Sequence, residues 1–137
     1  MQTVNLDQKL AQFSDHWNPR IVGELNGQQV KLVKFLGPFT WHRHASEDEM
    51  FLVLHGRFRM EFREPDVRPQ ALAVPEMVDW RETAVWVEQG EFLIVPRGVL
   101  HRPVAESEVQ VLLFEPATTL NTGDAGGPLT RETLERL

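Results

Sequence analysis

The clearest pattern in the chain is the alternation of apolar and polar residues in RFRMEFR, residues 57–63. Phe58, Met60 and Phe62 alternate with arginine and glutamate, so an extended segment here has one buried and one wet face. EMFLVLH precedes this segment, and VWVE, EFLIVP and VQVLLFE follow it, with glycine and proline at the turns. Many short strands without a long helix between them predict an all-β sandwich or barrel, whose mouth or interior can hold a ligand.

The N-terminal region has a different periodicity. Apolar residues recur at helical spacing, and Asn5 or Asp7 can cap, so we expect a short amphipathic helix over residues 6–15. RIVGEL and QQVKLVKF then flank Asn26-Gly27, which is a strong signal for a two-residue hairpin turn. Two antiparallel strands should therefore lead into the rest of the sheet.

Two segments interrupt or end the strand pattern. Residues 64–84 contain three prolines within the eleven positions 65–75, and their apolar content favours an ordered insertion at the barrel rim. Met77 and Trp80 are expected to pack on the barrel mouth or on a partner subunit. Residues 116–137 are rich in Thr, Gly and Pro and should form an extended tail, with RETLERL adding a helical turn.

Composition limits the class of protein. A chain of 137 residues fits one domain, and the absence of cysteine excludes disulfides and thiolate metal sites. The net charge of -6 and the lack of a basic cluster argue against a nucleic-acid partner. No apolar run is long enough for a membrane span and no signal-peptide core is present, so we expect a cytoplasmic protein.

The candidate chemistry lies in two separated motifs. In an extended segment His42 and His44 project to the same side, and Glu49 and His101 add a carboxylate and a third imidazole. A lone histidine pair of this spacing is more often a surface or partly buried pair, but the additional donors at these positions reverse that interpretation. The set suits a divalent first-row metal ion, with Fe(II) and Mn(II) favoured and Ni(II) or Zn(II) as alternatives.

Other acidic and histidine residues fit this site less well. Glu49 shares its strand face with apolar residues, whereas Glu47 and Asp48 precede the strand and should be solvated. His55 faces the same way but lies roughly 20 Å along the strand, too far to join the same ion.

The spacing of the two motifs resembles the signature of the cupin superfamily. The first family motif is a glycine, HxH, a glutamate and a second glycine, and the second is a glycine, PxG and a histidine. The matching residues are Gly37, His42, His44, Glu49 and Gly56 in the first motif and Gly90, Pro96, Gly98 and His101 in the second. The chain departs from the pattern at Ala105, where the family often has an asparagine that is not a metal ligand.

The resemblance implies a double-stranded β-helix, the cupin jelly-roll barrel, with the metal inside and a short N-terminal helix. Residues 1–34 would form the helix and hairpin leading into the barrel, residues 35–115 the barrel with its insertion at 64–84, and residues 116–137 the tail. The chain looks like the small single-domain group described as mannose-6-phosphate-isomerase-like, a label that reflects fold more than activity. Because cupins commonly pair through N-terminal strands, a homodimer is expected.

The residues expected around the metal indicate the kind of ligand. Arg43 should point away from the histidine pair and Arg97 lies in a turn, so a phosphosugar lacks secure partners. The residues expected to line the pocket are apolar: Phe51, Val53, Met60, Val111 and Leu113.

We therefore expect a metal-dependent enzyme that oxidises a small, mostly apolar organic substrate, in the manner of a dioxygenase. The alternatives are a metal-dependent isomerase or cyclase, and a non-catalytic cupin that binds or senses a small ligand. The sequence nominates no general base for isomerisation besides Glu49.

Overall fold

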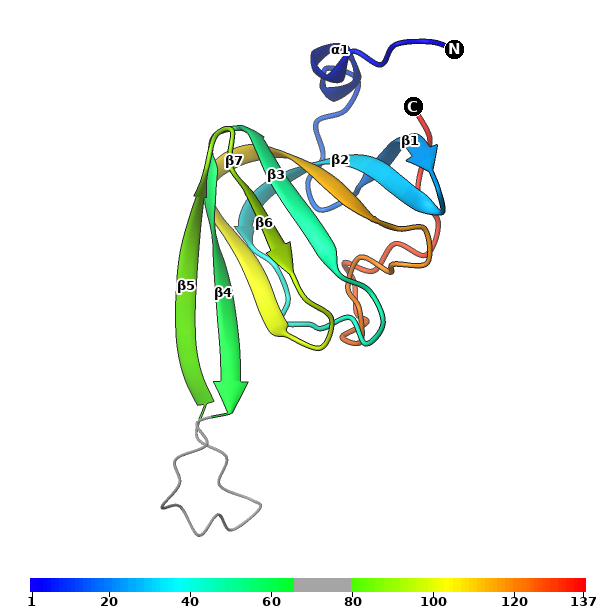
Figure 1. Ribbon diagram of the computed structural model, residues 1–137. Coiled ribbons are helices and arrows are strands. Elements are labelled where there is room, and N and C mark those ends of the chain that lie inside the picture. Colours follow the sequence, from blue (N-terminus) through cyan, green and yellow to red (C-terminus); the bar gives the residue numbers. More distant parts are fainter. Residues whose placement is uncertain (66–79) are drawn as a thin grey trace, which may run out of the picture.

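The computed structural model describes residues 1–65 and 80–137, which form one short helix and seven strands (Figure 1). The elements in chain order are α1 (Leu6–Leu10), β1 (Arg20–Leu25), β2 (Gln28–Pro38), β3 (Glu49–His55), β4 (Arg57–Pro65), β5 (Trp80–Glu88), β6 (Phe92–Val95) and β7 (Leu100–Pro116). The predicted all-β fold with a short N-terminal helix is confirmed. No helix in the described part of the chain is both long and apolar enough to cross a membrane.

Strand β7 connects the two parts of the barrel. Its residues 100–104 pair with β4, and its residues 109–116 lie between β2 and β3. The main path of the sheet is β1-β2-β7-β3-β6, with the β4–β5 hairpin attached through β7, and the strand pairs are antiparallel. Figure 1 shows β7, in yellow and orange, running along both parts. The motif residues on β3 and β7 are thereby brought to one interior.

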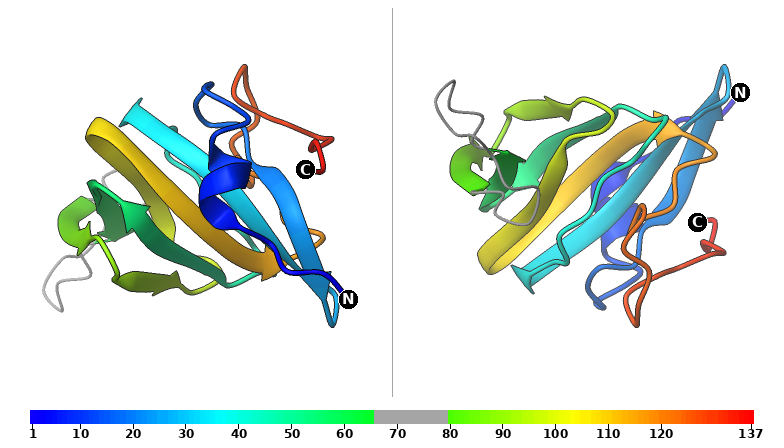
Figure 2. Two further views of the ribbon diagram at one scale, coloured as in Figure 1. Left: turned by 90° about the horizontal axis from the view of Figure 1, so that it is seen from above. Right: turned by 90° about the horizontal axis from the view of Figure 1, so that it is seen from below.

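The two faces of the strands bury two separate clusters. The barrel interior is filled by inward residues that include Phe35, Phe51 and Phe58, whose rings contact one another. On β2, Val33 points into the barrel. Its neighbour Leu32 points to the opposite face of the sheet and packs with Leu10 of α1. Figure 2 shows α1 on the outer face of the sheet.

The N-terminal expectations hold in part. Asn5 caps α1 by accepting a hydrogen bond from the Gln8 backbone N–H at 2.9 Å, and Asn26-Gly27 forms the hairpin turn with φ values of 51° and 76°. The helix predicted for residues 6–15 is too long, because it ends at Leu10. After it the chain turns toward the barrel, where Trp17 has a φ of 59° and its backbone N–H donates to Lys34 O.

The chain end also differs from the prediction. The helical turn expected in RETLERL is absent from residues 131–137, where Arg136 instead forms a parallel β-bridge with Ile21. Ile21 N–H donates to Glu135 O, and Leu137 N–H donates to Ile21 O. The backbone of β1 thus provides hydrogen-bond partners for the backbone groups of the last residues, which are extended.

The insertion predicted for residues 64–84 begins and ends in regular strand. Strands β4 and β5 pair as far as Pro65 and Trp80, so both ends of the predicted insertion belong to these strands. Met77 lies outside the described residues. Trp80 is 48% exposed in the single chain, and its packing on the barrel mouth or on a partner subunit stays a prediction.

Candidate metal centre

Four donor side chains from separate segments converge inside the barrel. His42 and His44 lie between β2 and β3, Glu49 is the first residue of β3, and His101 is the second residue of β7. One ligand atom from each of these four residues lies within 4.8 Å of the others, and all four side chains are buried. The structure therefore brings together the donors that the sequence grouped.

Backbone hydrogen bonds fix the histidine segment without a strand. We expected an extended strand here, but residues 39–48 contain only an isolated bridge at His42, which pairs with His101. Gly98 N–H also donates to His44 O at 2.7 Å. The predicted alternation still holds, because His42 and His44 are buried while Arg43 is exposed.

The far ring nitrogens of two histidines are already occupied. His42 Nδ1 lies 2.9 Å from Thr40 O, and His101 Nδ1 lies 2.8 Å from Val99 O. Because a carbonyl only accepts hydrogen bonds, each Nδ1 must carry the proton, which leaves the Nε2 lone pair free for a ligand bond. These carbonyl contacts therefore set the tautomer that a metal ligand requires.

The free donor atoms are buried without hydrogen-bond partners. Within residues 1–65 and 80–137, His44 Nε2, His101 Nε2 and Glu49 Oε1 have none. His44 Nε2 contacts Glu49 Oε1, and His101 Nε2 is 3.8 Å from the same oxygen. Leaving such atoms unsatisfied costs about 1–3 kcal/mol each. A shared cation would satisfy them together, so these residues fit a divalent metal ion.

Burial also favours the ligand forms of the histidines. Burial, with His101 nearby, lowers the pKa of His42 to about 3, and burial lowers the pKa of His101 to about 4. The pKa of His44 is lowered for the same reason. Burial raises the pKa of Glu49 to about 7. At neutral pH the imidazoles are therefore neutral, and Glu49 is the ligand from which a proton must be displaced.

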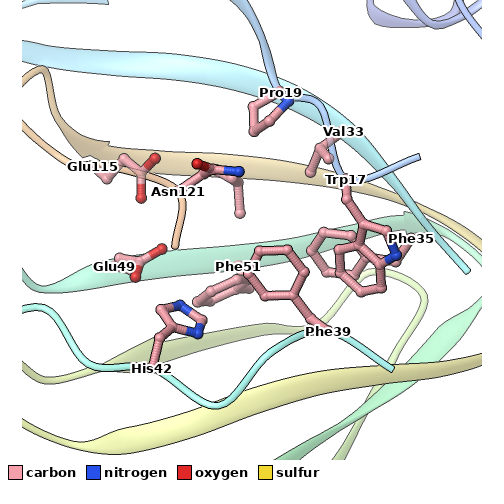
Figure 3. Close-up of a pocket in the computed structure, with 11 residues that line it drawn as sticks. Trp17, Pro19, Val33, Phe35, Phe39, His42, Glu49, Phe51, Glu115 and Asn121 are labelled. Atoms are coloured by element: carbon pink, nitrogen blue, oxygen red, sulfur yellow. The ribbon is translucent and has the colours of Figure 1, made fainter. Parts of the chain in front are cut away.

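A narrow cavity adjoins His42 and Glu49. Figure 3 shows Glu49, Glu115 and Asn121 gathered at one end and aromatic side chains at the other. The lining residues are Trp17, Pro19, Val33, Phe35, Phe39, His42, Glu49, Phe51, Leu113, Glu115 and Asn121. The cavity volume of about 30 Å³ is enough for one or two water molecules, so an organic ligand needs movement of the wall.

The predicted pocket residues divide into two groups. Phe51 and Leu113 line the cavity. Val53, Met60 and Val111 do not, and we correct their assignment to the hydrophobic core. They are fully buried among the aromatic side chains that fill the barrel, so the interior is packed where we expected open space.

Trp17 closes one end of the cavity and was not expected at the site. Its ring stacks on Phe35 and Phe39, with centroid distances of 4.5 and 4.7 Å, and its Nε1 donates to Leu36 O at 3.0 Å. Its N-terminal segment has no sequence signal that predicts this contact. Asn121 likewise enters from the tail.

Glu115 and Lys31 form a second polar group that sequence reasoning missed. Lys31 Nζ lies 2.7 Å from Glu115 Oε1, and the two side chains are only 1% and 2% exposed. Burial and the neighbouring Glu49 carboxyl raise the pKa of Glu115 well above its ordinary value. Alternation along the strands was the available signal, because Lys31 shares its face with Val33, and Glu115 shares its face with Leu113.

The residues set aside from the sequence lie outside the cluster. Asp48 is exposed and pairs with Arg97, whose Nε lies 3.1 Å from Asp48 Oδ1, and Glu47 accepts from Thr118 Oγ1. His55 Nε2 lies 3.2 Å from Asp7 Oδ1 at the surface. His16 pairs with the partly exposed carboxylate of Glu108.

Comparisons with known proteins support the fold and the family. No family model matches the chain. An uncharacterized Bacillus subtilis protein, YdbB, is 31% identical over 81 residues, which are 59% of this chain and 57% of YdbB. The chain thus spans little more than half the length of this curated relative.

Two solved structures are informative. The hydroquinone 1,2-dioxygenase PnpCD, solved with Cd²⁺ and 4-hydroxybenzonitrile, is 23% identical, with a TM-score of 0.61 over 88% of this chain and 71% of that chain. A cupin-2 domain protein from Shewanella frigidimarina is 34% identical, with a TM-score of 0.68 over 82% of this chain and 93% of that chain. With the confirmed barrel and the two motifs, this similarity shows that the chain belongs to the cupin superfamily.

Proposed function

We propose that this cupin binds one divalent first-row metal ion through His42, His44, Glu49 and His101 and oxidises a small, mostly apolar organic molecule with dioxygen. The observation that carries the proposal is the set of buried donor atoms that lack hydrogen-bond partners among the described residues, beside an aromatic-lined cavity. Buried polar atoms are normally satisfied, and a cation is the partner that suits three imidazoles and a carboxylate.

Each part of the site has a distinct task in this account. His42, His44, Glu49 and His101 would hold an iron or manganese ion, which would supply Lewis-acid and redox chemistry for the reaction with dioxygen. Thr40 O and Val99 O hold the imidazoles of His42 and His101 in one tautomer and orientation. Trp17, Phe39 and Phe51 offer apolar contact to the substrate and keep bulk water from the reacting atoms.

The known relatives support the substrate class only through fold. PnpCD is a hydroquinone 1,2-dioxygenase, and its structure contains the phenolic ligand 4-hydroxybenzonitrile. An aromatic wall is suited to such a ring, because stacked and edge-on aromatic contacts stabilise it. Phenols and dihydroxybenzenes are therefore the first substrates to test.

The test combines metal analysis with oxygen consumption. Protein loaded anaerobically with Fe(II) should hold about one ion per chain and consume dioxygen with at least one phenolic substrate. His101→Ala should lose both properties, whereas His55→Ala, an exposed histidine outside the cluster, should keep them. Failure of the wild-type protein to retain a divalent ion contradicts the proposal.

A second candidate is a metal-assisted isomerase or cyclase. The specific observation in its favour is Glu115, a carboxyl group in the cavity wall that can accept a proton, since the sequence alone offered no such base besides Glu49. Metal-dependent turnover without oxygen consumption would favour this candidate. Metal-dependent ligand binding without turnover would favour a binding or sensor role.

A further inference from the structure

The buried ion pair of Lys31 and Glu115 is placed where packing does not require it. Both residues occupy strand positions whose inward neighbours, Val33 and Leu113, are apolar. Moving two charges out of water is costly, and an apolar pair of similar volume is often as stable or more stable. A stabilising role is therefore a weak explanation for a charged pair at the wall of the cavity.

One carboxylate oxygen of Glu115 is fixed and the other is free. Lys31 Nζ donates to Oε1 at 2.7 Å, while Oε2 is buried without a hydrogen-bond partner among the residues that the structure describes. Asn121, the amide beside it, is already engaged, because its Nδ2 donates to Leu129 O and its Oδ1 accepts from Arg131 N–H. Glu115 Oε2 thus has no donor among the described residues, and the group beside Glu115 is the Glu49 carboxyl of the ligand cluster.

We propose that Glu115 is a recognition residue of the cavity, whose free oxygen accepts a hydrogen bond from a hydroxyl or N–H group of a ligand bound at the histidine cluster. Lys31 is its positioning residue, because the ion pair aims the carboxylate. The ligand class follows from the geometry: a small molecule with one oxygen or nitrogen for the metal and a second protic group for Glu115. This inference rests on the proposed metal site and narrows its substrate class.

Matched probes test the second protic group directly. Each dihydroxybenzene is compared with its monomethyl ether, which keeps one hydroxyl and removes the other proton. Dissociation constants are read from the visible spectrum of Co(II)-loaded protein, so turnover is not required. At least one isomer should bind wild-type protein about ten- to hundredfold more tightly than its ether, because the ether leaves the buried Glu115 oxygen without a donor.

Two variants separate recognition from structure. Lys31→Met with Glu115→Leu removes both charges, and Glu115→Gln keeps the shape of the side chain. Both should still bind Co(II), because the four ligands are unchanged, although the lost charge beside Glu49 should shift the affinity. In the Co(II)-loaded variants, the preference for the dihydroxybenzene over its ether should fall to about threefold or less. Glu47→Gln, at a half-buried carboxyl near the cluster, should leave the preference unchanged.

The outcomes distinguish this inference from the proposed function. Equal affinity of wild-type protein for each dihydroxybenzene and its ether, or an unchanged preference in both Glu115 variants, overturns the recognition role while leaving metal-based ligand binding intact. If wild-type protein does not bind Co(II), or if no probe changes the Co(II) spectrum, the proposed site fails and the inference fails with it.

Discussion

His42 and His101 exchange two backbone hydrogen bonds across the barrel, with N···O distances of 3.0 and 2.9 Å. Their rings lie with centroids 4.3 Å apart, so the backbone bridge places two imidazoles side by side. Strand β7 supplies one residue and the loop before β3 supplies the other. The ligand cluster is therefore held by the fold itself.

Because backbone hydrogen bonds hold the ligand cluster, we expect the protein to stay folded without metal. Chelator treatment should leave the far-UV circular dichroism spectrum unchanged, and added metal should raise the free energy of unfolding by about 2.7 kcal/mol at a hundredfold excess over Kd. Thermal denaturation measures this shift. His42→Ala should abolish it and His16→Ala should keep it, because only His42 is in the cluster. Unfolding on metal removal would show that the fold depends on the ion.

The pH dependence of metal affinity should follow Glu49. Burial raises its pKa to about 7, so below pH 7 a proton must leave Glu49 before the metal binds. Affinity should fall about tenfold per pH unit between pH 7 and 5 and level off above pH 7. The pKa of His42 is about 3 and that of His101 about 4, so these imidazoles compete for protons only at lower pH.

Isothermal titration calorimetry over this pH range checks the sign and slope. Histidines with their ordinary pKa would instead weaken metal binding below about pH 6.5. Glu49→Gln should bind more weakly and lose most of the slope between pH 5 and 7. Release of two or more protons for each metal ion bound between pH 5 and 7 would show that the histidines, too, are protonated in the metal-free protein.

The Lys31–Glu115 pair should show strong coupling in stability. Lys31→Met leaves a buried carboxyl group without its cation and should lower the free energy of unfolding by about 3 kcal/mol. The double variant Lys31→Met/Glu115→Leu should return to within about 1 kcal/mol of wild type, because no buried charge remains. Urea denaturation gives both values. A double variant as unstable as the single one would mean that the pair stabilises the fold.

Gly123 should be essential for docking the tail beside the ligands. It has a φ of 53°, and a Cβ there would lie 2.2 Å from the backbone oxygen of Arg43, between His42 and His44. Gly123→Ala should therefore lower the free energy of unfolding by about 2 kcal/mol or more and weaken metal binding.

The matched control for that change is Gly126→Ala. Gly126 also has a positive φ, 62°, but its Cβ would meet nothing within 4 Å among the described residues. Only the conformational cost of about 1 kcal/mol should appear, without a change in metal affinity. Equal effects of the two substitutions, measured by denaturation and metal titration, would exclude the contact with Arg43 as the cause.

The ligand cluster and most strands could be predicted from sequence because their signals are local. Alternation identified the buried face of β4 and placed His42 and His44 on one side, and the motif spacing added Glu49 and His101. The first part of β7 was missed, since Pro103 and a run of polar residues do not resemble a strand. It forms because β4 pairs with it.

The cavity could not be predicted, since its walls come from tertiary packing. Trp17 and Asn121 reach it from irregular segments whose position depends on the whole barrel. Glu115 shares its face with apolar residues, but a charged residue near a strand end is ordinarily expected to reach solvent. The homodimer stays a prediction, which light scattering can test.

The most direct test of the metal site is anomalous X-ray diffraction from crystals of Co(II)-loaded protein at the cobalt absorption edge. The account predicts one strong peak inside the barrel, about 2.0–2.2 Å from the Nε2 atoms of His42, His44 and His101 and from a Glu49 oxygen. Absence of a peak among these four side chains, in crystals that retain cobalt elsewhere, would contradict it.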